Sequence, residues 1–162
     1  MIFEQIEING DRNLAYLIGD EETKKAILID PAYNIKEILK KIIDYGLKLE
    51  YIICTHGHFD HVNGNNIIKE KTGAKVVMYE TTDVKCDIRV KDNETLKVGN
   101  LTFKFIFTPG HSKDGMCILA DNKLITGDTL FIGMVGGTSF EEDAKKQFMA
   151  LKRLMQLDDD IE

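Results

Sequence analysis

Short apolar runs, each bounded by Asn, Asp or Gly, occupy the first thirty positions of the chain. Residues 2–8 alternate apolar and polar side chains, residues 13–19 read NLAYLIG and residues 25–30 read KAILID. Alternation with a period of two and short bounded apolar runs are typical of β-strands. The pattern therefore predicts that the chain opens with an antiparallel sheet.

A helix is predicted over residues 35–45, where apolar positions recur at helical spacing. Asn34 is placed to cap its first turn and Gly46 to close its end. The strand YIICT follows, then the polar segment HGHFDHVNGNN, a short helix over about residues 65–72 that Gly73 ends, and the strand KVVMY. This order predicts a β-loop-α-β unit in the middle of the chain.

Two further pairs of strands are predicted in the second half of the chain. Each pair is separated by a turn dipeptide, Gly99-Asn100 or Asp121-Asn122, as is typical of hairpins. The strands are ETLKV, LTFKFIFT, MCILA and KLITG.

The last predicted element is an amphipathic helix over about residues 141–156. Its apolar stripe consists of Phe140, Ala144, Phe148, Leu151 and Met155. Such a stripe needs a sheet face to cover, so the pattern favours an α/β fold, an αββα sandwich, over a β-barrel. The segment LDDDIE that follows resembles a turn leading into another strand. We therefore expect residues 1–162 to form a single domain that lacks its C-terminal strand or strands.

Composition and charge narrow the classes of function. A chain of 162 residues with 43% hydrophobic and 30% charged residues fits one globular domain. Its net charge of −6 argues against nucleic acid or an anionic membrane surface as a partner. The sequence has no apolar run of the ~20 residues that a membrane span needs and no secretion-signal pattern, so we expect a cytoplasmic protein. Three widely spaced cysteines predict no disulfide framework.

The four histidines of the chain lie in only two places. His56, His58 and His61 belong to THGHFDH, which also contains Asp60, and His111 belongs to TPGHS. Imidazole nitrogen and carboxylate oxygen are suitable ligands for zinc, and they also suit iron or manganese. A solvated polar loop is the alternative interpretation. Three histidines and an aspartate within six residues favour metal binding over that alternative.

His111 and Asp128 each follow a predicted strand, at the position where α/β folds often place functional side chains. Taken alone, His111 is better explained as a surface turn residue, and Asp128 as a helix cap or a turn carboxylate. The first histidine cluster favours the interpretation that both residues join a common site.

The order of DPAYN, THGHFDHVNG, TPGHSKDG and LITGDTLF resembles the metallo-β-lactamase superfamily, and most closely its glyoxalase II-like (hydroxyacylglutathione hydrolase-like) branch. The resemblance covers residues from about 12 to 157. It implies that one metal site and the beginning of a second are present, with a bridging carboxylate. The implied ligands are His56, His58 and His111 for the first metal, Asp60 and His61 for the second, and Asp128 between them.

Asp30, in LIDP, matches the first motif of the superfamily, which usually supplies a supporting carboxylate. A turn aspartate before Pro31 predicts much the same geometry. The resemblance thus assigns Asp30 a place beside the site rather than a metal bond.

The implied chemistry is hydrolysis of a small-molecule substrate, a thioester or similar acyl compound. One cation, or two about 3.5–4 Å apart, lowers the pKa of bound water toward ~7, so that metal-bound hydroxide can attack a carbonyl carbon. We assign catalytic roles to Asp60, as a proton acceptor or shuttle, and to Asp128. Zinc is the expected metal, as one or two ions, and iron or manganese would suit the same ligands.

Two features depart from the family pattern. Relatives usually supply one more histidine after the amphipathic helix, whereas this sequence ends at Glu162. We therefore expect the first metal site to be filled and the second to be weak, and an unpaired sheet edge to favour a homo-oligomer. The segment GMVGGT, residues 133–138, lacks the basic residue that many thioester hydrolases carry there, which argues against glutathione recognition.

Two alternatives to a metal-dependent hydrolase remain open. An iron-dependent persulfide dioxygenase would use an open iron site, with His56, His58 and Asp128 as the ligands that the resemblance implies. A truncated, non-catalytic domain that binds metal is the other alternative, because of the missing histidine.

Overall fold

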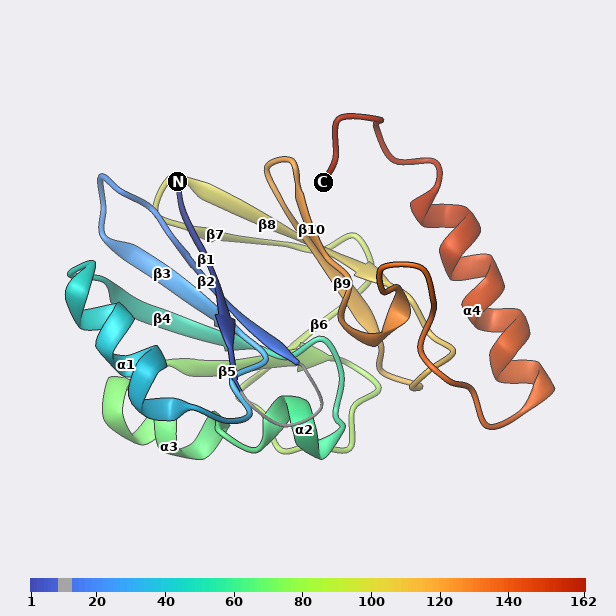
Figure 1. The fold of residues 1–162 in the computed structure, drawn as a ribbon, viewed down its shortest axis with the longest axis horizontal. Coiled ribbons are helices and arrows are strands. Elements are labelled where there is room, and N and C mark those ends of the chain that lie inside the picture. Colours follow the sequence, from blue (N-terminus) through green and yellow to red (C-terminus); the bar gives the residue numbers. More distant parts are fainter. Residues whose placement is uncertain (9–12) are drawn as a thin grey trace.

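Two β-sheets packed face to face form the centre of the protein, and helices cover the outer side of each sheet (Figure 1). The computed structural model describes residues 1–8 and 13–162; residues 9–12, which include the Asn9-Gly10 boundary between the first two predicted strands, lie outside it. The layers confirm the predicted αββα sandwich. Within the described part, no helix combines the length and apolar character needed to cross a bilayer.

The first sheet has six strands in the order of the chain. They are β1 (Ile2–Glu7), β2 (Leu14–Gly19), β3 (Lys25–Ile29), β4 (Lys48–Ile53), β5 (Lys75–Tyr79) and β6 (Ile88–Val90). The pairs β1–β2 and β2–β3 are antiparallel, as predicted, and β3 to β6 are parallel. The three-residue β6 was not predicted. Helices α1 (Ile35–Asp44) and α3 (Asn65–Thr72) cover the outer face of this sheet.

The second sheet has four antiparallel strands in the order β10-β9-β8-β7. They are β7 (Thr95–Val98), β8 (Leu101–Phe107), β9 (Met116–Ala120) and β10 (Lys123–Ile125), which confirms both predicted hairpins. At the outer edge of β10, the backbone N–H of Glu162 donates to the carbonyl of Asn122, and the N–H of Leu124 donates to the carbonyl of Glu162, both at 2.8 Å. The segment that follows the last helix therefore meets this edge.

The inner core lies between the two sheets. Alternate residues of β3 and β4, including Ile27, Ile29 and Ile53, face Phe103 and Phe105 of β8, and all five side chains are fully buried. Burying each such side chain contributes about 1.5–3 kcal/mol. The residues between them face α1 and α3. Both faces of β3 and of the C-terminal half of β4 are thus buried, which explains the apolar runs AILI and YII.

The first turn of α1 differs from the prediction. Asn34 precedes the helix, but its backbone is left-handed with φ of 51°, and its side-chain amide donates to the carbonyl of Glu7 at 2.9 Å. Capping side chains normally come from an extended residue, so the predicted cap by Asn34 is wrong. Gly46, with φ of 62°, donates its N–H to the carbonyl of Ile43 and ends the helix as predicted.

Helix α4 (Glu141–Leu154) lies along the second sheet but turns a different face to it than the sequence predicts. In the predicted stripe, Phe148 is 60% exposed and Met155, just after the helix, is 84% exposed. The buried residues are Gln147, Ala150 and Leu154, about 100° further round the helix. Gln147, on the buried face, makes polar contacts that are described below.

A buried aspartate joins the two sheets at the end remote from the candidate site. Asp20, after β2, accepts hydrogen bonds from the hydroxyl of Thr23 at 2.7 Å and from the backbone N–H of Asn100, in the β7–β8 turn, at 2.6 Å. Its other oxygen accepts the N–H of Glu22. These bonds, chiefly that from Thr23, lower the pKa of Asp20 to about 2.

Replacing Asp20 with Asn should lower the free energy of unfolding at neutral pH, because the amide offers one acceptor fewer to three donors. The folded-state pKa lies below that of the unfolded chain, about 3.9. The ionised carboxylate of Asp20 therefore adds its full contribution to the free energy of unfolding above about pH 4, and this contribution is lost as the pH falls toward 2. Urea unfolding at pH 7, 4 and 2.5 should show the difference between wild type and D20N shrinking. The variant Asp121→Asn, at an exposed turn position, should show no such trend. A difference in unfolding free energy between wild type and D20N that stays constant with pH would contradict this account.

Candidate metal centre

The candidate residues meet at one end of the sandwich, where strands of both sheets end. β3 and β4 run parallel, so the residues after them emerge at the same edge. The second sheet delivers the remaining two residues to this edge from the ends of β8 and β10. The positions are Asp30 after β3, His56 and His58 after β4, Asp60 and His61 in α2 (Phe59–Val62), His111 after β8, and Asp128 in the 3-10 turn Gly127–Thr129.

Three imidazoles form the first group. Nε2 of His56 lies 2.9 Å from Nδ1 of His58, and Nε2 of His111 lies 3.0 Å from the same atom. Nitrogen ligands at about 2.0–2.1 Å from a tetrahedral zinc ion are about 3.3 Å apart. The three side chains can therefore hold one cation after a small outward movement.

A second group shares His56 with the first and adds His61 and Asp128. Oδ1 of Asp128 lies 3.3 Å from Nε2 of His61, and its Oδ2 lies 3.4 Å from Nε2 of His111. Asp128 thus stands between the two groups. Asp60 is at the edge: its Oδ2 is 3.7 Å from Nε2 of His61, and its side chain is 35% exposed.

The outer nitrogen of two of these rings is fixed by a hydrogen bond. Nδ1 of His111 lies 2.8 Å from the carbonyl of Gly137, which can only accept, so this nitrogen carries the proton. Nδ1 of His61 lies 2.9 Å from a carboxylate oxygen of the buried Asp30. Nε2 of both rings therefore points inward.

His56 is fixed in the same way through Thr55. The hydroxyl of Thr55 donates to Asp30 at 2.7 Å and lies 3.1 Å from Nδ1 of His56. Since its one proton is used, the hydroxyl accepts from Nδ1–H of His56. Outer hydrogen bonds of this kind accompany most metal-binding histidines, because they fix the tautomer that leaves Nε2 free.

The electrostatics of the two rings in the second group differ. Burial, reinforced by the positive charge of His61, lowers the pKa of His56 to about 2, so His56 is neutral with a free lone pair. Burial opposes the charged form of His61 too, but Asp30 and Asp128 outweigh it and raise its pKa to about 10. These carboxylates create a negative potential that favours a cation between them.

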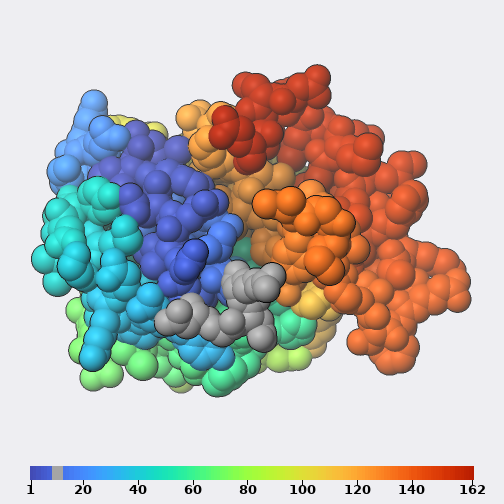
Figure 2. Space-filling model, viewed as in Figure 1, coloured from blue at the N-terminus to red at the C-terminus, as the bar shows by residue number. Residues whose placement is uncertain are grey.

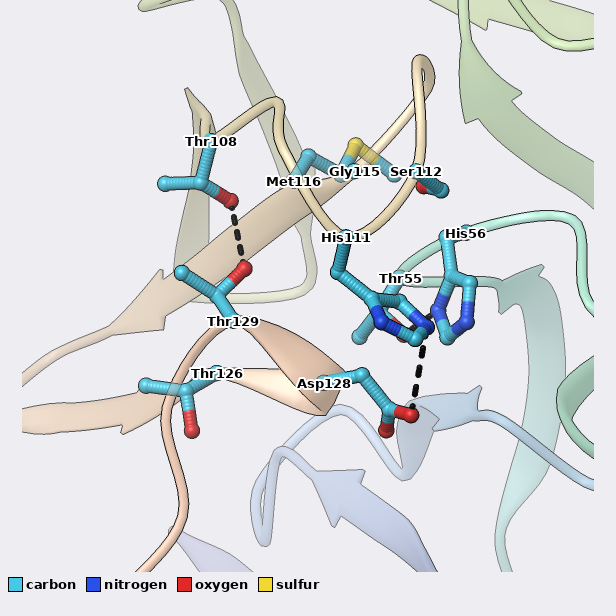
Figure 3. A pocket seen from close by; sticks show the side chains of 10 residues that line it. All are labelled: Thr55, His56, Thr108, His111, Ser112, Gly115, Met116, Thr126, Asp128 and Thr129. Atoms are coloured by element: carbon cyan, nitrogen blue, oxygen red, sulfur yellow. Dashed lines mark hydrogen bonds and ion pairs between the residues drawn. The ribbon is translucent and has the colours of Figure 1, made fainter. Parts of the chain in front are cut away.

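The cavity beside the rings is small. Its volume is about 10 Å³, which is room for roughly one water molecule. In Figure 3 the rings of His56 and His111 lie side by side with the carboxylate of Asp128 pointing toward them. The loop of residues 130–135 lies next to this cavity and exposes apolar side chains, with Ile132 entirely in solvent. The loop is part of the orange segment that protrudes in Figure 2.

Two residues that support the site, Asn13 and Thr55, were not predicted from the sequence. The amide of Asn13 donates to Oδ2 of Asp60 at 2.8 Å and lies 3.4 Å from Nε2 of His61. Thr55 belongs to a predicted strand and carries no metal-ligand signal of its own. Neither residue could be found without the fold, because each acts on a group from another segment.

The segment GMVGGT, residues 133–138, which lacks the basic residue that many thioester hydrolases carry there, packs directly on the site. The backbone N–H of Gly136 donates to the carbonyl of Asp128 at 3.1 Å. A Cβ on Gly136 would lie 2.0 Å from that carbonyl oxygen and 2.9 Å from Nδ1 of His111. Glycine is required here by this close approach.

Substituting Gly136 with Ala should therefore destabilise the protein by about 1–3 kcal/mol, the usual range for overpacking. Gly137→Ala is the matched control, because its added methyl meets nothing within 4 Å among the described residues. That control should stay within about 0.5 kcal/mol of wild type. Urea unfolding measures both variants, and equal stabilities of G136A and G137A would refute the proposed close contact.

Comparison with known proteins identifies the family. Residues 8–86 match the metallo-beta-lactamase superfamily. The structure is similar to that of ETHE1 from Myxococcus xanthus, with a TM-score of 0.93 and 32% identity over 99% of this chain and 73% of that one. The chain belongs to the metallo-β-lactamase superfamily.

Curated relatives give the same result. A hydroxyacylglutathione hydrolase of Francisella tularensis subsp. novicida is 37% identical over 94% of this chain and 62% of its own length. A probable polyketide biosynthesis zinc-dependent hydrolase, BaeB of Bacillus velezensis, is 31% identical over 88% of this chain and 66% of its own. The chain thus spans slightly less than two thirds of the length of these two relatives.

Proposed function

We propose that this chain is a metal-dependent hydrolase that cleaves a thioester or similar acyl compound. The observation that carries the proposal is the group formed by His56, His58 and His111, in which two outer nitrogens are held by protein acceptors and the remaining nitrogens converge. The names of the curated relatives, which include a zinc-dependent hydrolase, support this choice.

The donor set fits a divalent metal ion. His56, His58 and His111 would hold one cation; His61 and Asp128, with Asp60 nearby, would hold a second. Imidazole and carboxylate ligands suit zinc, and they also accept iron or manganese. Such a cation supplies Lewis acidity, which polarises a carbonyl group and makes a neighbouring water more acidic.

The residues of the chain divide the remaining work. Burial opposes ionisation of Asp60, but the hydrogen bond from Asn13 and the charge of His61 together lower its pKa, so Asp60 is a carboxylate at neutral pH. Asp60 then accepts the proton of the attacking water. Water adds to the acyl carbon, the carbon–sulfur bond breaks, and the proton passes from Asp60 to the thiolate that leaves.

The surroundings of the site suit an uncharged acyl group. Residues 129–140 contain no charged side chain, and the loop 130–135 presents apolar side chains beside the candidate ligands. An anionic thiol such as glutathione would find no cation in this segment. The acyl portion therefore offers the better match to this surface.

Removal and return of metal test the proposal. Purified protein treated with a chelator should lose its ability to release thiol from an acyl thioester, and zinc should restore it. His111→Ala should lower kcat/KM by at least about 100-fold, because it removes one imidazole from the group. The exposed variant Asp121→Asn is the control and should retain wild-type activity.

Elemental analysis of the same preparation separates the alternatives. Thioester cleavage that survives complete metal removal would contradict the proposal. Bound iron with sulfur-dependent oxygen uptake and no thiol release would favour a persulfide dioxygenase. Tight zinc binding without turnover of any acyl thioester would favour a non-catalytic metal-binding domain.

A further inference from the structure

Gln147 is a polar residue of α4 that is only 2% exposed. Its side-chain amide donates to two backbone carbonyls, that of Gly136 at 2.9 Å and that of Thr129 at 3.4 Å. These carbonyls lie at the two ends of the apolar loop 130–135. One amide group thus ties together both limbs of the loop.

Both limbs are connected to candidate metal ligands, one along the chain and the other through hydrogen bonds. Thr129 follows Asp128 directly, and the N–H of Gly136 donates to the carbonyl of Asp128 at 3.1 Å. The next residue, Gly137, accepts the hydrogen bond from Nδ1 of His111 at 2.8 Å. Gln147 is therefore one residue removed from the atom that orients His111 and one residue removed from Asp128.

Helix α4 also packs closely against the residue that precedes His111. Gly110 precedes that histidine, and a Cβ on it would lie 2.3 Å from Cβ of Gln147 and 2.7 Å from its backbone nitrogen. The backbone of α4 at Gln147 thus contacts the strand end that carries His111, while the side chain of Gln147 hydrogen-bonds to the loop 130–135 at both of its ends.

Within the described part of the chain, the amide of Gln147 has its donors paired but its acceptor unpaired. Oε1 of Gln147 is buried and finds no hydrogen-bond partner among the residues that the structure describes. An unpaired buried acceptor is unfavourable, and a leucine of similar size would avoid it. The two donated hydrogen bonds are what the amide provides and leucine does not.

We infer that Gln147 is a positioning residue of the metal centre, which holds Asp128 and His111 in register through the loop limbs at Thr129 and Gly136. The inference rests on the proposed metal site. It assigns α4 a role beyond covering the second sheet, because the helix fixes two ligands that come from different strand ends. It also gives a role to the one polar side chain on the buried face of α4.

The test compares Gln147→Leu with Leu154→Ala. The first removes the two donors and keeps side-chain volume. The second weakens the packing of α4 on Ile106 and Cys117, outside the loop. Gln147→Met, which is of similar length, uncharged and without a donor, is the second variant should Q147L fail to fold.

Zinc competition with a chelator, and the visible spectrum of the cobalt-substituted protein, give the readouts. Q147L or Q147M should bind zinc about 10–100-fold more weakly and shift the cobalt bands, as loss of supporting hydrogen bonds does in metal sites. L154A should lower the unfolding midpoint yet keep zinc affinity within about twofold. Wild-type affinity and spectrum in the Gln147 variants would overturn the inference, and so would an equal loss in L154A.

A measurement on metal-free protein keeps this inference separate from the proposed function. Nitrogen NMR of the histidine rings should show His111 of wild type with its proton on Nδ1, and a redistribution between the two nitrogens in Q147L. Wild type that binds no metal would contradict the proposed function, whereas an unchanged His111 signal in Q147L would contradict the role of Gln147.

Discussion

The candidate site depends on the hydrogen bonds of Thr55, which join the two sheets. Its N–H and hydroxyl both donate to the carboxylate of Asp30, at 2.8 and 2.7 Å, and its carbonyl accepts the N–H of Met116 from the second sheet at 2.9 Å. Gly127 approaches so closely that a Cβ on it would lie 2.5 Å from the Thr55 hydroxyl oxygen. Because His56 follows Thr55 and Asp128 follows Gly127, this junction fixes the candidate ligands of one sheet relative to those of the other.

Asp30 shows how a buried charge is maintained at this junction. Its carboxylate is 2% exposed and accepts hydrogen bonds from the N–H and hydroxyl of Thr55 and from Nδ1 of His61. A buried carboxylate without such partners would be strongly unfavourable, and here the partners are themselves the groups that orient His56 and His61. The same hydrogen bonds thus stabilise the core and orient the candidate ligands, so that the stability of the protein and the geometry of the candidate site are coupled.

The sequence predicted the sheets, both hairpins and the αββα layers, because alternating and continuous apolar runs reflect which faces are buried. It missed β6 and α2, which have three and four residues and are too short for any periodicity. It misassigned the buried face of α4, because periodicity shows only where the apolar side chains lie, whereas the buried face carries Gln147, whose acceptors Thr129 and Gly136 come from another segment. The histidines could be singled out because they cluster in the sequence. Asn13 could not, since its role beside Asp60 depends on a contact 47 residues away along the chain.

Anomalous diffraction at the zinc absorption edge, on crystals grown with zinc, tests the central claim most directly. The account predicts a zinc peak about 2.0–2.2 Å from imidazole nitrogens of His56, His58 and His111, with the three rings moved apart around it. Full zinc saturation with peaks only on surface carboxylates, and with these three imidazoles still in contact with one another, would contradict it.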